Sequence, residues 1–219
     1  MNKTIIFCLA FALLLGIVQH TSANNSENIT GNMLFQEVTI ELDGNAATRA
    51  DYFAGKNPRA VIFAPGAMFS KESWHFLAAR FQDLEIGSIA LNSGASPDLL
   101  NGLAFLKAKG VQKIAIIGAS AGGAGVLYTL RDTPAPLVDK VVLLAPAGGP
   151  PLQNNIIQKL FIVAEDDMIS SSAEVYKLYK SSSDPKLYRE IKGSDHAQRL
   201  FDSKEKENIV QLIVQFIQN

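Results

Sequence analysis

The apolar and polar positions of this chain change their spacing along its length, and this change predicts an alternation of strands and helices. From about Phe35 onward, short apolar runs alternate with amphipathic stretches. Residues 35–42 alternate with a period of two, which is typical of an edge strand. Residues 48–54 can pair with them across an evident turn at residues 43–45, so we expect the sheet to start with an antiparallel pair.

Continuous apolar runs farther along the chain predict strands that are buried on both faces. These runs occupy residues 59–64, 86–91, 113–117 and 160–164, and residues 138–144 and 187–191 are two further predicted strands. Helical spacing predicts helices between them, at residues 71–82, 97–109, 172–180 and 203–217, with a further helix that opens at Ala121. The predicted fold class is therefore α/β, a three-layer α/β/α sandwich around a mostly parallel, eight-stranded sheet.

The N-terminal residues have the pattern of a targeting segment. Residues 1–3 supply a positive start, residues 5–18 form an unbroken apolar run, and Thr21, Ser22 and Ala23 are a plausible cleavage site. The run is too short for a comfortable membrane span, so we expect export to the periplasm or the medium without stable membrane insertion, with an uncleaved signal anchor as the alternative. The expected organisation is a signal peptide at residues 1–23, a polar leader at 24–34 and one domain at 35–219.

Composition narrows the class of protein further. A chain of 219 residues with 47% hydrophobic and 19% charged residues is ordinary for one globular domain. A net charge of −1 without a basic patch argues against a nucleic-acid partner. Cleavage of the signal peptide would remove Cys8, the single cysteine, and His20, which leaves His75 and His196. Two histidines are too few for a convincing zinc site, and we expect neither a metal nor an organic cofactor.

One strand-to-helix turn carries the clearest chemical motif. Gly118-Ala119-Ser120-Ala121-Gly122 fits the pattern Gly-x-Ser-x-Gly, in which a serine lies on a strained turn with its hydroxyl exposed. Small residues are needed there because the backbones of the strand and the helix approach closely. The peptide N–H of Ala121 opens the helix, where unpaired donors favour the negative charge that develops during acyl transfer.

The same turn has two other interpretations. It resembles the dinucleotide-binding turn of short-chain dehydrogenases, and it can also be a tightly packed crossover without chemistry. The dinucleotide is disfavoured because several strands precede the turn and only about 100 residues follow it. Tyr176 and Lys180 form a Tyr-x-x-x-Lys pair, but far too close behind the turn for that family. A dinucleotide-dependent oxidoreductase is therefore not expected.

Two further polar segments follow predicted strands, where an open α/β sheet places its active site. One buried strand runs into an acidic segment with Asp166 and Asp167, and the last strand runs into a loop with His196. Each loop alone would be read as a solvated surface turn. The order Ser120, Asp167, His196 matches that of a nucleophile, an orienting carboxylate and a general base, and this joint placement favours a catalytic triad.

From its first predicted strand onward, the chain resembles the α/β-hydrolase superfamily, in particular its small, capless serine esterases. The resemblance implies that Ser120 is the nucleophile, His196 the base and Asp167 the acid. Members usually have Gly-x-x-Asp-x-x-Val around the acid. Here Ala164 replaces the glycine, so Asp166 remains a rival for Asp167.

The resemblance also implies where a substrate oxyanion would bind. Members often have His-Gly-x after the third strand, and Pro65-Gly66-Ala67-Met68 occupies this place. Only backbone N–H groups are needed, so Ala67 is expected to donate beside Ala121, with Met68 as the rival of Ala67. The missing histidine leaves open how this loop is braced.

The expected function is that of a serine hydrolase that cleaves carboxylic esters or thioesters through an acyl-enzyme. The segment at residues 147–158, where many relatives insert a cap, is short, which favours an open site for small-molecule or polymer-attached esters. An acyltransferase would use the same residues, and an exported non-catalytic binding protein with the same fold is the alternative from another class. The sequence leaves the oligomeric state open.

Overall fold

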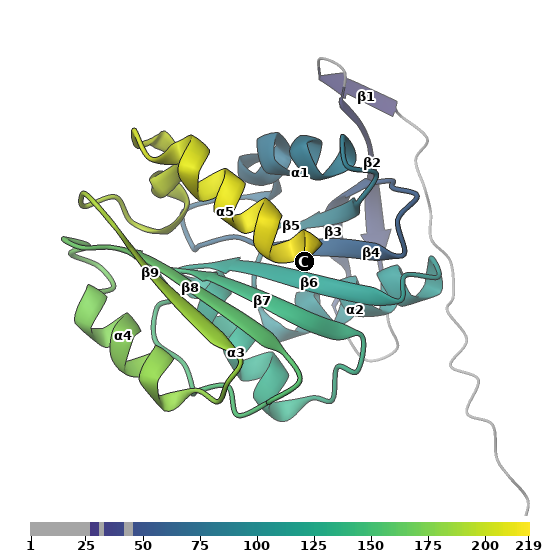
Figure 1. Cartoon of the computed structure of the whole chain (residues 1–219). Helices are drawn as coiled ribbons and strands as arrows, with labels where there is room; N and C mark the ends of the chain where they lie inside the picture. Colours follow the sequence, from purple (N-terminus) through teal and green to yellow (C-terminus); the bar gives the residue numbers. More distant parts are fainter. Residues whose placement is uncertain (1–26, 31–32, 42–45) are drawn as a thin grey trace, which may run out of the picture.

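A computed structural model describes residues 27–30, 33–41 and 46–219. These residues form a nine-stranded sheet in the order β1-β2-β3-β5-β4-β6-β7-β8-β9 (Figure 1). The strands are Glu27–Thr30 (β1), Met33–Ile40 (β2), Thr48–Phe53 (β3), Arg59–Ala64 (β4), Gly87–Leu91 (β5), Lys113–Ala119 (β6), Val138–Leu144 (β7), Gln158–Ala164 (β8) and Lys186–Ile191 (β9). The expected signal peptide at residues 1–23 lies outside the described residues.

Strand direction divides the sheet into two parts. Pairing is antiparallel from β1 through β3 to β5, and it is parallel from β5 through β4 and β6 to β9. The predicted antiparallel start is confirmed, because β2 pairs with β3. The sheet has one strand more than predicted, because Glu27–Thr30 of the polar leader pairs with β2. This strand lies at the sheet edge and lacks an apolar alternation, so no burial pattern in the sequence predicts it.

Helices cover both faces of the sheet and make it the middle of three layers. They are His75–Gln82 (α1), Ser96–Ala108 (α2), Ala121–Asp132 (α3), Ser172–Ser181 (α4) and Lys206–Gln218 (α5), with 3-10 turns at Lys71–Trp74 and Ala197–Asp202. In Figure 1, α1 and α5 lie above the sheet and α3 and α4 below it, with α2 packed against α3. The predicted three-layer sandwich is confirmed. The helix predicted at residues 71–82 is divided between a 3-10 turn and α1, and the last helix starts three residues later than predicted, at Lys206.

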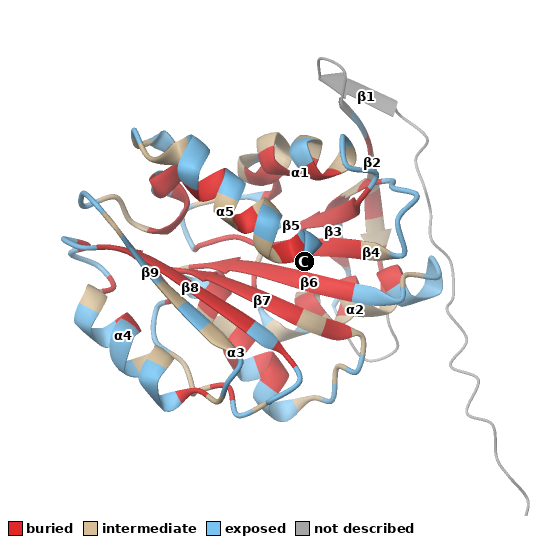
Figure 2. Ribbon diagram, in the orientation of Figure 1, coloured by how far each residue is buried: buried red, intermediate tan, exposed pale blue. Residues whose placement is uncertain are grey.

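The parallel strands form the centre of the core (Figure 2). Every residue of β5 is buried, and so are all residues but one in each of β4, β6, β7 and β8. Helices on both faces explain why these strands have continuous apolar runs. In contrast, the side chains of the edge strand β9 are exposed or half-buried. Within the described part of the chain, no helix is long and apolar enough to cross a membrane.

The parallel strands direct their carboxyl ends to one edge of the sheet. The loops after β4, β6, β8 and β9 therefore meet at that edge, where open α/β sheets bind their ligands. Four of the five crossovers from β4 to β9 each contain a helix, α1 to α4 in chain order. The fifth, at residues 145–157 between β7 and β8, is described throughout and contains no helix.

Candidate active site

Ser120 lies at the sharp turn between β6 and α3, and it is half-buried. Its backbone has φ 47° and ψ −118°, outside the regions that residues with a Cβ favour. Glycines on both sides make the turn possible. A Cβ at Gly122 would lie 2.3 Å from the carbonyl oxygen of Ala64, and one at Gly118 would lie 2.8 Å from Cα of Gly123. The close approach of strand and helix that the motif requires is therefore present.

His196 joins Ser120 to Asp167 by hydrogen bonds. Its Nε2 lies 2.8 Å from Ser120 Oγ, and its Nδ1 lies 2.8 Å and 3.1 Å from the two carboxylate oxygens of Asp167. An ionised carboxylate only accepts hydrogen bonds, so Nδ1 carries the hydrogen, and Nε2 of the neutral ring accepts the hydroxyl hydrogen of Ser120. Three side chains from three separate loops thus form one continuous chain of hydrogen bonds.

The carboxylate of Asp167 is buried and held by its own turn. Its Oδ1 accepts hydrogen bonds from the backbone N–H groups of Ile169 at 2.8 Å and Ser170 at 2.9 Å. Such bonds to residues two and three positions ahead are typical of an aspartate that starts a turn. Asp166, its rival in the sequence, is exposed. The structure therefore brings Asp167, and not Asp166, to His196.

The loop after β4 passes directly beside Ser120. A Cβ at Gly66 would lie only 3.2 Å from Cβ of Ser120, so the backbone approaches the serine closely at this position. Ala67 and Met68 follow Gly66 and are exposed, and Ala121 is the first residue of α3. The two expected N–H donors, those of Ala67 and Ala121, thus belong to the two segments that adjoin the serine. The choice of Ala67 over Met68 stays a prediction.

Gln198 braces this loop, and sequence reasoning did not identify it. Its Oε1 accepts a hydrogen bond from the backbone N–H of Gly66 at 2.8 Å, and its Nε2 donates to Ser73 Oγ at 2.6 Å. The Ser73 hydroxyl donates in turn to the carbonyl oxygen of Ser70 at 2.6 Å. Gln198 is buried and lies two residues after His196. The turn that follows His196 therefore also fixes the loop after β4 at both ends, at Gly66 directly and at Ser70 through Ser73.

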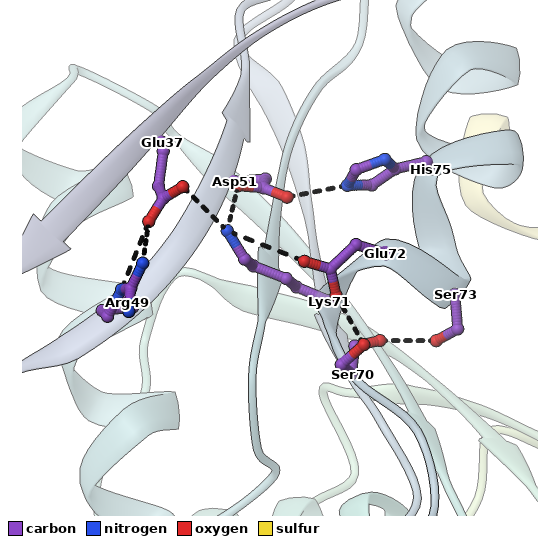
Figure 3. A network of polar contacts seen from close by, with 8 residues as sticks. All are labelled: Glu37, Arg49, Asp51, Ser70, Lys71, Glu72, Ser73 and His75. Atoms are coloured by element: carbon purple, nitrogen blue, oxygen red, sulfur yellow. Dashed lines mark hydrogen bonds and ion pairs between the residues drawn. The ribbon is translucent and has the colours of Figure 1, made fainter. Parts of the chain in front are cut away.

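A charged network holds the chain where that loop ends (Figure 3). The ammonium group of Lys71 lies 2.6 Å from Asp51 Oδ1 and 3.5 Å from Glu37 Oε2, and His75 Nε2 lies 2.7 Å from Asp51 Oδ2. Lys71 and Asp51 are both buried, so each charge needs the opposite charge of its partner to offset the cost of removing it from water. A hydrogen bond from the Arg49 guanidinium, together with the charge of Lys71, lowers the pKa of Glu37 from its ordinary value.

His75, the other histidine that lies outside the expected signal peptide, is part of this network. Its ring packs against Phe35 and Phe53, with ring centroids 4.8 Å and 5.4 Å apart. These contacts give it a structural role at the start of α1. Among the described residues, no group of three or more His, Cys, Asp or Glu side chains is placed so that it could hold a metal ion.

Comparisons with known proteins identify the fold. No protein-family model and no curated protein matches the sequence. A dienelactone hydrolase from Anabaena variabilis matches the structure with a TM-score of 0.70 and 16% identity, over 84% of this chain and 97% of that one. The esterase domain of a Rhodothermus marinus protein gives a TM-score of 0.68 and 15% identity, over 84% of this chain and 98% of that one.

An esterase from Exiguobacterium antarcticum is similar to the same extent, with a TM-score of 0.67 and 10% identity, over 83% of this chain and 99% of that one. These matches span almost the full length of each solved protein, and at such low identities what they share with this chain is the arrangement of the sheet and its helices. The chain therefore has the α/β-hydrolase fold, as its motifs predicted.

Proposed function

We propose that the protein is a serine hydrolase that cleaves carboxylic esters or thioesters. The observation that carries this proposal is the hydrogen-bond chain from Ser120 Oγ through the imidazole of His196 to the buried carboxylate of Asp167. A hydroxyl, an imidazole and a carboxylate in this order supply a nucleophile, a base and a group that orients the base. The names of the similar structures, two esterases and a dienelactone hydrolase, support the same reaction class by analogy.

In the proposed reaction, Nε2 of His196 takes the proton of Ser120 as Oγ attacks the carbonyl carbon of the ester. The imidazolium that forms keeps its Nδ1–H on Asp167, whose negative charge stabilises it. His196 then gives the proton to the leaving alcohol or thiol, and the acyl group stays on Ser120. Water activated by the same imidazole hydrolyses this acyl-enzyme and restores the free serine.

The former carbonyl oxygen carries the negative charge of each tetrahedral intermediate. We assign its stabilisation to the N–H groups of Ala121, at the amino end of α3, and of Ala67. Loss of one such donor typically costs about 3 kcal/mol of transition-state stabilisation. Gln198 would act as a positioning residue here, because its bond to Gly66 fixes the backbone immediately before Ala67.

Substrate and location follow from the same proposal. The short β7–β8 crossover leaves the site without a cap, which supports a small-molecule or polymer-attached ester as substrate. The pattern of residues 1–23 supports export of the mature protein. An acyltransferase would pass the acyl group from Ser120 to an alcohol in place of water, whereas an exported binding protein with this fold would not react at all.

Reaction with a fluorophosphonate probe tests the proposal. The wild-type protein should be labelled at Ser120, and Ser120→Ala should not be labelled. His196→Ala should react with the probe on the order of a thousandfold more slowly than the wild type, or not at all, because the hydroxyl loses its base. Ser194 provides a matched control, because it is an exposed serine two residues before His196. Ser194→Ala should be labelled like the wild type.

Other outcomes of this experiment separate the alternatives. Labelling that persists in folded Ser120→Ala would rule out Ser120 as the nucleophile. A folded wild-type protein that is not labelled would favour the non-catalytic binding protein. If labelling succeeds, product analysis of an ester substrate with and without an added alcohol distinguishes hydrolysis from acyl transfer.

A further inference from the structure

A groove lies between α4 and the helix-free crossover that connects β7 to β8. Its volume is about 540 Å³, which falls within the range of about 300–1,000 Å³ that is usual for ligand sites. One wall is formed by Pro146 to Gly149 and by Pro151 of the crossover. The other wall consists of α4 and the two residues Ile169 and Ser170, which lie shortly before it.

One end of the groove is hydrogen-bonded to the proposed catalytic residues. In the first wall, the backbone N–H of Ala147 donates to the carbonyl oxygen of Ser120 at 3.0 Å. In the second wall, the backbone N–H of Ser170 donates to Asp167 Oδ1 at 2.9 Å. Both walls therefore start from residues that hold the proposed triad in place. One end of the groove therefore lies beside the proposed site.

The groove then follows α4 away from the triad. Its lining continues from Ile169 along the helix to Ser181, which is the last of the ten residues of α4. A helix of this length spans about 15 Å. At the far end, Pro151 belongs to the opposite wall. The shape is thus elongated, with its length along the helix and one end at Ala147 and Ser170, the residues that bond to Ser120 and Asp167.

The inner surface of the groove is mainly apolar. On the α4 side, Val175 is buried and Leu178 is half-buried, and prolines line the opposite wall. The charged residues of the lining, Glu174 and Lys177, are exposed, so their charged groups can stay in water at the open side. Ile169 is 70% exposed at the end next to the triad. A bound apolar chain would cover this side chain.

We propose that this groove binds the acyl chain of the substrate, and that the preferred substrates are esters of extended, mainly apolar acyl groups of medium length, such as octanoyl. This inference rests on the proposed function, because it requires the ester carbonyl at Ser120. An extended chain matches an elongated groove, and it lies along the surface without needing a cap. Partial burial of its methylenes should raise kcat/KM for octanoyl over acetyl esters on the order of ten- to a hundredfold.

The test measures kcat/KM for p-nitrophenyl acetate and p-nitrophenyl octanoate with the full-length protein. Ile169→Asn places a polar side chain at the entrance of the groove, and Leu178→Trp fills its middle. Each change should lower the octanoate-to-acetate ratio about tenfold, because the chain loses apolar contacts. Ile156→Asn is the matched control, because Ile156 is 77% exposed but precedes β8 and lies outside the groove. It should leave the ratio unchanged.

Two different failures can be told apart in this experiment. If the wild type prefers acetate, or if neither groove variant changes the ratio, the acyl groove is wrong while the proposed hydrolase can still stand. If neither ester is hydrolysed in a manner that depends on Ser120, the proposed function itself fails. Use of the ratio makes the result independent of any loss of folded protein, because both esters are measured on the same preparation.

Discussion

Two histidine–aspartate pairs in this molecule have nearly the same geometry. His196 Nδ1 lies 2.8 Å from a carboxylate oxygen of Asp167, and His75 Nε2 lies 2.7 Å from one of Asp51. The aspartate side chains are 0% and 1% exposed, and the histidine side chains are 12% and 16% exposed. Distance and burial therefore do not distinguish the two pairs.

The neighbours of each pair do distinguish them. The second ring nitrogen of His196 meets the hydroxyl of Ser120, and backbone N–H groups hold Asp167. Asp51 instead shares its carboxylate with the ammonium group of Lys71. A carboxylate that is already paired with a cation stabilises an imidazolium less. We therefore expect an imidazole to act as a base only where its second nitrogen reaches a hydroxyl and no cation competes for its carboxylate.

Removal of each imidazole should give the largest difference in activity between the two histidine–aspartate pairs. His196→Ala should lower kcat for an ester substrate on the order of a millionfold, because Ser120 would lose its proposed base. His75→Ala should keep a kcat close to that of the wild type, because its carboxylate partner is bonded to Lys71 and not to the proposed site. Steady-state kinetics on protein shown to be folded by circular dichroism compares the two. Similar losses of kcat would mean that the Asp51 pair also takes part in the chemistry.

Replacement of each carboxylate by an amide should separate activity from stability. Asp167→Asn should lower kcat on the order of 10⁴-fold, because the amide neither fixes the tautomer of His196 nor stabilises its cation. Asp51→Asn should instead lower the free energy of unfolding by about 3 kcal/mol, because the buried ammonium group of Lys71 loses its closest partner. Urea denaturation and steady-state kinetics measure the two effects.

A second substitution provides the control for the stability effect. Lys71→Met in the Asp51→Asn background removes the unpaired charge, so part of the lost free energy of unfolding should return. If it does not return, burial of the Lys71 charge is not the cause of the loss. A large drop in kcat for folded Asp51→Asn would contradict the structural role of this pair.

Substitution of Gln198 should have the smallest of these effects. It tests only the His196 pair, because Gln198 belongs to the turn that follows His196. Gln198→Ala should lower kcat about ten- to a hundredfold with little change in KM, because the loop with Ala67 loses its fixed position. Affinity for a boronic acid analogue of the transition state should fall in parallel. Ser73→Ala keeps the bond to Gly66 and should lose less activity. A fall in melting temperature with kcat and analogue affinity unchanged would reduce Gln198 to a structural residue.

Features that burial determines could be predicted from the sequence. The run at residues 138–144 has the same bounds as β7, because both faces of this strand are covered. Asp167 also has the place of the acid in the pattern Gly-x-x-Asp, three residues after position 164. The structure adds how this carboxylate is held, because it accepts a hydrogen bond from the backbone N–H of Ile169.

Features that depend on distant partners could not be predicted. Gln198 bonds to a backbone group 132 positions earlier, and its one local signal is a long polar side chain between the apolar residues Ala197 and Leu200. The strand at Glu27–Thr30 forms by backbone pairing with β2, which leaves no apolar pattern. The groove that is proposed to bind an acyl chain lies beside the crossover at residues 145–157, which is described throughout and contains no helix. A sequence pattern shows only that this segment is short.

The strained turn at Ser120 has a consequence for the heat resistance of the protein. Among the described residues, four residues other than glycine have positive φ: Glu85, Ser120, Ala145 and Ala197. Such conformations cost about 1–3 kcal/mol each, and glycine would adopt them more easily. Three of them border the candidate site, after β6, after β7 and next to His196. Engineering for thermal tolerance should therefore start at Glu85, in the turn between α1 and β5, because the same glycine replacement at the other three positions would disturb the edge of the sheet where the proposed chemistry takes place.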